Sequence, residues 1–285
     1  MKTNRAKVVT ITSRKDAVGK TTITALLARY FTEIEGKKVI VIDLDERGGI
    51  TTILHGKTIP SNMYTAAKLL TLEPIVKDMR KRFLKAIIKI NLDMRDISIN
   101  NSGQLYLLPE EPMNDIMFDY KSLESLNNIL HDLNISKDHV ILVDTSTDLT
   151  SILIGLRAAD IVFLPLRYGM QEIIPTVEIL LMIRDEQRKN GKPFVGGLII
   201  NPWVDSVFQW DQIYEKEFNW FFDFKNQYSN QLLPITNIFI HLEQSQIIQK
   251  RKFMNLPFSD GLLDTAKELA YVIQENAITK RRNFK

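Results

Sequence analysis

The residues with the clearest capacity for chemistry are the four from 19 to 22, Gly-Lys-Thr-Thr. They follow residues 7–13 (KVVTITS), which are typical of a buried strand, and they open a helical pattern. Backbone N–H groups at a helix start, together with the helix dipole, attract an anion. Gly19 permits close backbone approach, the Lys20 ammonium can reach a phosphate, and the Thr21 hydroxyl can bind Mg²⁺. The spacing predicts a phosphate-binding loop.

Acidic residues end two other apolar runs. Residues 37–45 end with Asp43 and Asp45, which lie two apart and therefore on the same side of an extended strand. Residues 139–144 end with Asp144, in the manner of a Walker B acid that holds Mg²⁺ through water. Because the carboxyl ends of parallel strands meet at one edge of a sheet, we expect these carboxylates beside the loop.

The remaining pattern alternates apolar runs with helical stretches. Further strands are expected at 104–109, 160–166, 194–200 and 235–240, and helices at 19–35, 121–134, 150–158, 171–190, 205–229 and 260–276. Apolar strands followed by helices indicate an α/β fold, a doubly wound and mostly parallel sheet flanked by helices. We expect one domain over 1–285, with a helical segment at 57–100.

Residues 15–22 resemble a known loop: they read Lys-Asp-Ala-Val-Gly-Lys-Thr-Thr, and the deviant Walker A loop of the ParA/MinD superfamily of P-loop ATPases reads Lys-Gly-Gly-Val-Gly-Lys-Thr-Thr. Residues 43–47 are similar to that family's second signature, Asp-x-Asp-Pro-Gln, with Glu46 and Arg47 in place of Pro-Gln. The resemblance implies ATP and Mg²⁺ as cofactors. It implies nucleotide contacts from Lys15, Asp16, Ala17, Val18, Gly19, Lys20, Thr21, Thr22 and Asn201, with Thr21, Asp43 and Asp144 serving the metal. It further implies that Lys15 crosses a dimer interface, that Asp45 activates the attacking water, and that Lys15, Lys20 and Asp45 carry catalysis.

The loop departs from the family at Asp16 and Ala17, which replace two glycines. A non-glycine residue in the left-handed conformation costs about 1–2 kcal/mol, although Asp tolerates it better than most. Asp16 also brings negative charge toward phosphates, and Arg14 is the residue expected to compensate. Weak nucleotide binding, or loss of hydrolysis, follows as an alternative.

Composition and charge indicate which branch of the superfamily the chain resembles. The chain has 285 residues, a net charge of +3 and no cysteine. The absence of cysteine excludes disulfides and cysteine-ligated clusters and disfavours the metallocluster carriers of the superfamily.

Two groups of basic residues are candidates for a DNA-binding surface. An amphipathic helix is expected at 75–90, and basic residues recur on it every four positions: Lys77, Lys81, Lys85 and Lys89. The second group is Lys250, Arg251 and Lys252. Such stripes suit DNA phosphates without base reading. The tip of the basic tail 277–285 has only Phe284 as a large apolar residue that could insert into a bilayer, which disfavours a membrane anchor. The aromatic-rich segment 203–230 is expected to be a packed helix or a partner-docking surface.

The resemblance, taken with these observations, implies a ParA-like ATPase of DNA partition. It would dimerise on ATP, bind DNA non-specifically, and hydrolyse ATP slowly under stimulation by a ParB-like centromere-binding protein. We expect a cytoplasmic, nucleoid-associated protein without stable membrane association. Two alternatives stay open, a MinD-like ATPase that cycles on a membrane and a ParA-like scaffold that binds nucleotide without hydrolysing it.

Overall fold

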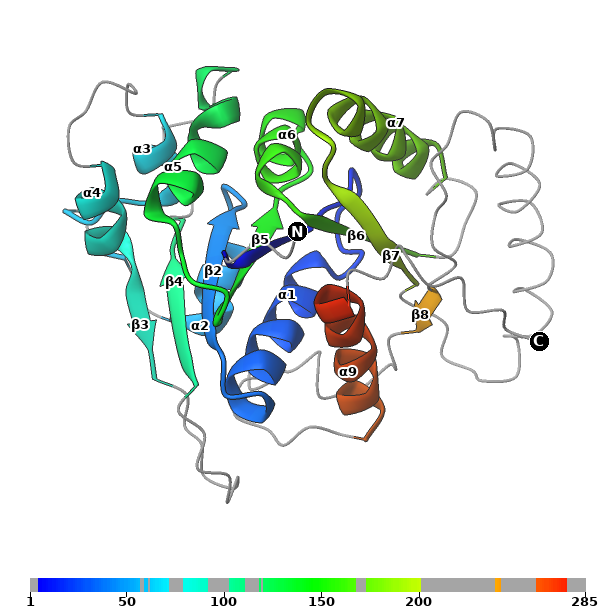
Figure 1. Cartoon of the computed structure of the whole chain (residues 1–285), viewed down its shortest axis with the longest axis horizontal. Helices are drawn as coiled ribbons and strands as arrows, with labels where there is room; N and C mark the ends of the chain where they lie inside the picture. The colour runs from blue at the N-terminus through cyan, green and yellow to red at the C-terminus, as the bar shows by residue number, and fades with distance from the viewer. Residues whose placement is uncertain are drawn as a thin grey trace.

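One sheet runs through the part of the chain that the structure describes. This computed structural model describes residues 5–56, 59–60, 62–71, 79–91, 103–110, 118, 120–167, 173–200, 239–241 and 260–275. Their eight strands lie in the order β3-β4-β2-β5-β1-β6-β7-β8 (Figure 1). The strands are β1 (Lys7–Ile11), β2 (Lys38–Leu44), β3 (Ile88–Ile90), β4 (Gln104–Leu108), β5 (His139–Thr145), β6 (Ile161–Leu166), β7 (Phe194–Ile200) and β8 (Phe239–His241). Only the β3–β4 pair is antiparallel among them. The predicted doubly wound, mostly parallel sheet is confirmed.

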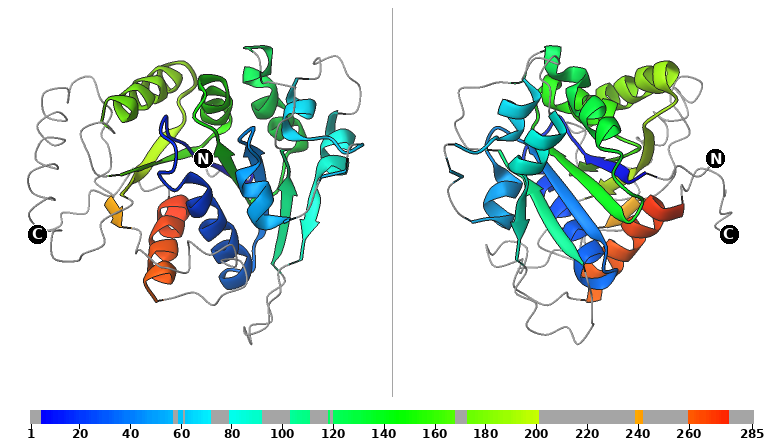
Figure 2. Two further views of the ribbon diagram at one scale, coloured as in Figure 1. Left: turned by 180° about the vertical axis from the view of Figure 1, so that it is seen from behind. Right: turned by 60° about the vertical axis from the view of Figure 1, so that its left-hand side comes forward.

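Helices cover both faces of this sheet (Figures 1 and 2). One face carries α1 (Lys20–Arg29), α2 (Gly49–Leu54) and α9 (Asp260–Glu275), and the other carries α3 (Ala66–Leu70), α4 (Met79–Ala86), α5 (Ser125–Leu133), α6 (Leu149–Ala158) and α7 (Ile173–Asn190). A π-helical turn (Tyr30–Ile34) extends α1, and a 3₁₀ turn (Tyr120–Glu124) precedes α5. Among the described helices, none has the length and apolar character needed to cross a membrane.

The central strands are apolar throughout because both of their faces are covered. On β1, Val9 and Ile11 pack in the cluster that contains α1 and α9, whereas Val8 packs in the cluster that contains α5. Alternate residues of one strand therefore serve two separate cores, which holds β1 in the middle of the molecule. Its carboxyl end leads directly into the predicted phosphate loop.

The segment 57–100 contains a strand as well as helices, which corrects the expectation of a helical segment. The basic helix expected over 75–90 ends at Ala86, and β3 then pairs with β4. A run of β-branched isoleucines, Ile87, Ile88 and Ile90, favours a strand wherever a partner edge is present, and β4 supplies that edge.

Helix α6 packs very closely on β1 and β5 at Gly155. A Cβ atom there would lie 2.9 Å from the Cγ2 atoms of both Thr10 and Thr145. The Thr10 hydroxyl also donates a hydrogen bond to the Gly155 carbonyl at 2.9 Å. Glycine at this position is therefore a requirement of the close packing of α6 on the two strands.

The variant Gly155→Ala should be less stable than the wild type. Overpacking costs about 1–3 kcal/mol, generally more than the gain of up to about 1 kcal/mol in helix propensity. Urea unfolding should show a lower midpoint. Leu149→Ala, an exposed site on the same helix, is the control and should change stability by no more than about 0.5 kcal/mol. A Gly155→Ala midpoint at or above that of the wild type would contradict the close packing.

Candidate nucleotide site

The loop between β1 and α1 has the strand–loop–helix context expected from the sequence. Gly19 lies directly before α1 in a left-handed conformation, with φ of 102°, and Val18 beside it is fully buried. The first N–H groups of an α-helix have no acceptor within the helix, so this turn presents donors to an anion. The local geometry is therefore suited to a phosphate group.

Lys20 lies folded inside the loop. Its side chain is almost completely buried, and Nζ donates to the Lys15 carbonyl oxygen at 3.1 Å. Burial lowers the pKa of Lys20, while the carboxylates of Asp144, Asp16 and Asp45 oppose that shift. A buried ammonium that rests on one carbonyl has donors left for a second acceptor.

Of the two positions where the family has glycines, only the second is left-handed here. Ala17 has φ of 56°, and Asp16 does not have a positive φ. Arg167, at the end of β6, donates from Nε to the Ala17 carbonyl oxygen at 2.9 Å. The strain expected at both residues therefore falls on Ala17, and a contact from a distant strand stabilises the turn.

The prediction that Arg14 offsets the negative charge of Asp16 is wrong. Arg14 forms an ion pair with Glu178 of α7 at 3.1 Å. Asp16 is instead paired with Arg47, whose Nη2 lies 2.5 Å from Asp16 Oδ1. Arg47 follows Asp45 in the turn between β2 and α2, so its charge reaches the loop from another segment of the chain.

Asp43 and Asp144 are paired in register on adjacent strands, and neither is exposed. Burial, and then the charge of Asp144, raise the pKa of Asp43 well above its usual value. Burial raises the pKa of Asp144 to about 7, against the opposing effects of the Thr21 hydroxyl, the Lys20 charge and the Thr24 hydroxyl. The two carboxylates form the buried acidic floor of the site.

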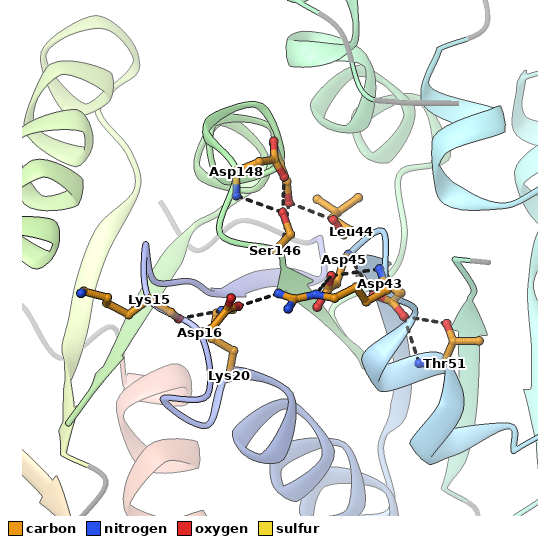
Figure 3. Close-up of polar contacts among 11 residues, drawn as sticks. Lys15, Asp16, Lys20, Asp43, Leu44, Asp45, Thr51, Ser146 and Asp148 are labelled. Atoms are coloured by element: carbon orange, nitrogen blue, oxygen red, sulfur yellow. Dashed lines mark hydrogen bonds and ion pairs between the residues drawn. The ribbon is translucent and has the colours of Figure 1, made fainter. Parts of the chain in front are cut away.

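Hydrogen bonds hold Asp43 in place (Figure 3). Its Oδ1 accepts from the Asp45 N–H at 3.0 Å, and its Oδ2 accepts from the N–H and the hydroxyl of Thr51 at 3.0 and 2.7 Å. Strand β2 ends at Leu44, so Asp45 begins the turn that follows the strand. Both oxygens of Asp43 thus serve to shape the β2–α2 turn, and its assignment to the metal stays a prediction.

A network that the sequence analysis missed joins the ends of β2 and β5. The Ser151 hydroxyl donates to the Leu44 carbonyl at 2.9 Å and accepts from the Ser146 N–H at 3.1 Å. Asp148 caps α6 by accepting from the Ser151 N–H at 2.9 Å, and it is also hydrogen-bonded to Ser146. The spacing of Asp148 and Ser151 at a helix start is an N-cap signal that could have predicted part of this hydrogen-bond network.

The surroundings of Asp144 suit the magnesium site expected from the sequence, and the assignment of Asp144 and Thr21 to the metal stays a prediction. Asp144 Oδ2 is buried and has no hydrogen-bond partner among the described residues, which leaves a lone carboxylate oxygen for a cation or its water. In the described part of the chain no cluster of three or more His, Cys, Asp or Glu side chains could hold a metal alone. This arrangement suits Mg²⁺, which usually keeps waters and phosphate oxygens as ligands.

The other predicted residues are distributed over several places. Lys15 is half-buried, and its side chain extends away from the acidic cluster in Figure 3. Lys81 and Lys85 are exposed on α4, and Lys89 is exposed on β3, with β4, β2 and β5 between that strand and β1. Thr22 lies half-buried in the first turn of α1. Five candidates lie outside the described residues, as do segments 203–230 and 277–285: Asn201, Lys77, Lys250, Arg251 and Lys252.

The loop lies between a central parallel strand and a helix, and acidic residues at the ends of two neighbouring strands lie beside it. This arrangement is typical of a P-loop protein. A family model described as an AAA domain matches residues 6–190. The chain belongs to this family and is a ParA-like member of the P-loop ATPases. None of the curated proteins matches the sequence.

Solved structures share the fold at low identity. A putative plasmid partition protein from Borrelia burgdorferi B31 bound to AMPPNP is 18% identical with a TM-score of 0.62, covering 95% of this chain and 99% of that one. The pNOB8 ParA bound to nonspecific DNA is 20% identical with a TM-score of 0.60, covering 95% and 99%. Cobyrinic acid a,c-diamide synthase from Mycobacterium smegmatis with ADP and magnesium is 21% identical with a TM-score of 0.59, covering 88% and 93%. Proteins with different functions thus share this architecture.

Replacing Asp144 should change how stability depends on pH in the protein free of nucleotide and metal. Because folding raises the pKa of Asp144 from 3.8 to about 7, the folded state holds more protons between these values and stability falls as pH rises through them. Asp144→Asn removes this penalty and should stabilise the protein at pH 8, by roughly 1–4 kcal/mol. Urea titrations at pH 5 and pH 8 measure the effect.

The control for this prediction is Asp132→Asn, which changes the same charge at an exposed position on α5. It should leave stability nearly unchanged at both pH values. An Asp144→Asn variant that is less stable than the wild type at pH 8 would contradict the burial of an ionisable carboxyl in this site.

Proposed function

We propose that the chain binds ATP with Mg²⁺ and hydrolyses it slowly. Two groups carry the proposal. The buried Lys20 ammonium donates to the Lys15 carbonyl oxygen within the loop, and Asp144 Oδ2, whose charge acts on Lys20, has no hydrogen-bond partner among the described residues. Lys20 would exchange the Lys15 carbonyl for the β- and γ-phosphates. Thr21 and Asp144 would hold Mg²⁺, which neutralises phosphate charge when bound. Asp45 would orient the attacking water.

The second part of the proposal is an ATP-dependent homodimer. Lys15 supports it, because its side chain extends away from the site of its own chain and is therefore available to a second copy. Two triphosphates that face each other repel, and a lysine supplied across the interface would offset that charge. Binding of ATP would then favour the dimer, and hydrolysis would release it.

The third part concerns DNA. Lys81, Lys85 and Lys89 are exposed on consecutive elements at the outer edge of the sheet, where they would contact phosphates without reading bases. The proposal also includes a role in DNA partition and a ParB-like partner that stimulates hydrolysis. It places the protein in the cytoplasm, in association with the nucleoid. The neighbours named for plasmid partition and for ParA support it by their common fold.

Variants at Lys15 and Asp45 should separate dimer formation from hydrolysis. Lys15→Ala should bind ATP but stay monomeric, because the contact to the second nucleotide is lost. Asp45→Asn keeps an oxygen for the Arg47 hydrogen bonds, and it should dimerise and remain dimeric because ATP persists. Light scattering over time after ATP addition follows both variants, and phosphate release measures hydrolysis.

Lys20→Ala is the control and should bind no ATP in calorimetry. Dimerisation of Lys15→Ala at the wild-type level would remove the dimer from the proposal. A wild-type protein that dimerises without releasing phosphate would favour the scaffold that does not hydrolyse ATP.

The double variant Lys81→Glu/Lys85→Glu should weaken binding to all DNA sequences alike. The slope of log affinity against log salt should become shallower, by roughly 0.9 for each lost phosphate contact. The control Lys137→Glu/Lys189→Glu makes the same change in net charge at exposed positions elsewhere. Co-sedimentation with DNA and with anionic liposomes, each with and without ATP, measures the binding of the double variant and of its control. Binding to liposomes alone would favour the MinD-like alternative, and an unchanged slope would move the DNA surface away from α4.

A further inference from the structure

Arg47 connects two acidic residues that belong to different segments. Its Nη2 lies 2.5 Å from Asp16 Oδ1 in the loop after β1, and its Nε lies 3.3 Å from Asp45 Oδ1 in the turn after β2. One guanidinium therefore spans the phosphate loop and the residue proposed to orient water. We call this three-residue contact the Arg47 clasp.

Asp45 holds the guanidinium in position. Asp45 Oδ1 also accepts the Arg47 backbone N–H at 3.1 Å, and the Asp45 side chain is 10% exposed. This anchored geometry leaves Nη2 directed toward Asp16. The hydrogen bond that Arg47 donates to Asp16 is the largest cause of the lowered pKa of Asp16, and it is also the largest cause of the raised pKa of Arg47.

We propose that Arg47 is a positioning residue that neutralises Asp16 so that this loop can accept a polyphosphate. The inference rests on the proposed binding of ATP. An unpaired carboxylate at position 16 would repel the phosphates across a short distance. A guanidinium paired with that carboxylate removes the repulsion while the loop keeps its shape.

The charge of Arg14 does not provide this effect, because Arg14 pairs with Glu178 on α7. Lys20 attracts Asp16, but its Nζ is bonded to the Lys15 carbonyl and is the group proposed for the phosphates themselves. Arg47 is thus the cation in hydrogen-bonding contact with Asp16 among the described interactions.

The Asp16–Arg47 pair is more than half exposed on both sides, at 58% and 57%. Ion pairs this exposed contribute little to folding. Loss of Arg47 should therefore affect nucleotide affinity and leave the thermal unfolding midpoint within about 2 °C of the wild type. This separation distinguishes a positioning role from a structural one.

A double-mutant cycle with Arg47→Ala and Asp16→Asn tests the proposal. The probe is AMPPNP with Mg²⁺, and calorimetry measures its Kd for the full chain. Arg47→Ala should weaken binding about tenfold, whereas in the Asp16→Asn background the same change should weaken it less than about threefold. Raising the salt concentration should reduce the Arg47→Ala defect relative to the wild type, because salt screens repulsion.

Arg14→Ala is the matched control, since it removes the same charge from a residue of the phosphate loop that pairs with Glu178 and not with Asp16. Its effect on Kd should be equal in the two backgrounds. Equal weakening by Arg47→Ala in both backgrounds would overturn the clasp while ATP binding stands. A wild-type protein that does not bind AMPPNP would overturn the proposed function and the clasp together.

Discussion

Burial of two carboxyl groups at neighbouring strand ends is the constraint on which the rest of the site depends. Asp43 and Asp144 are register partners on β2 and β5 with no exposure to solvent, and a buried charge is costly unless donors or cations surround it. Thr51 and the Asp45 N–H satisfy Asp43. Asp144 has the Thr24 hydroxyl at 3.4 Å and one oxygen without a partner among the described residues. Of the two buried carboxylates, Asp43 is thus fully hydrogen-bonded, whereas Asp144 keeps one oxygen for a cation.

The hydrogen bonds that satisfy Asp43 extend into the neighbouring elements. The Thr51 hydroxyl donates to Asp43 and accepts from the Glu110 N–H at 3.0 Å. The buried Glu110 carboxylate accepts from the Ala67 N–H at 2.6 Å, at the start of α3. The end of β4, the start of α3 and the β2–α2 turn are therefore held around one carboxylate. A buried polar network of this kind fixes geometry because each member leaves an unsatisfied group if it moves.

The shape of the loop depends on residues far from it in sequence. Ala17 takes a left-handed conformation that costs about 1–2 kcal/mol for a non-glycine residue. Arg167 at the end of β6 bonds its carbonyl, and Arg47 pairs with the neighbouring Asp16. The loop has fewer glycines than its family pattern, and arginines from two other strand ends support it. Its conformation is accordingly a property of the whole carboxyl edge of the sheet.

The sequence by itself determined the parallel strands and the longer helices that alternate with them among the described residues, because a doubly covered parallel sheet requires apolar runs and these are local in sequence. It also placed Lys20 and the acids near one edge, since parallel strands end together. It did not predict that 88–90 would be a strand, because the β4 edge on which they pair lies elsewhere in the chain. It likewise assigned the neutralisation of Asp16 to the nearby Arg14. Only the tertiary structure decided that Arg47, 31 residues away, takes that role, because long side chains pair with whatever charge the fold brings within reach.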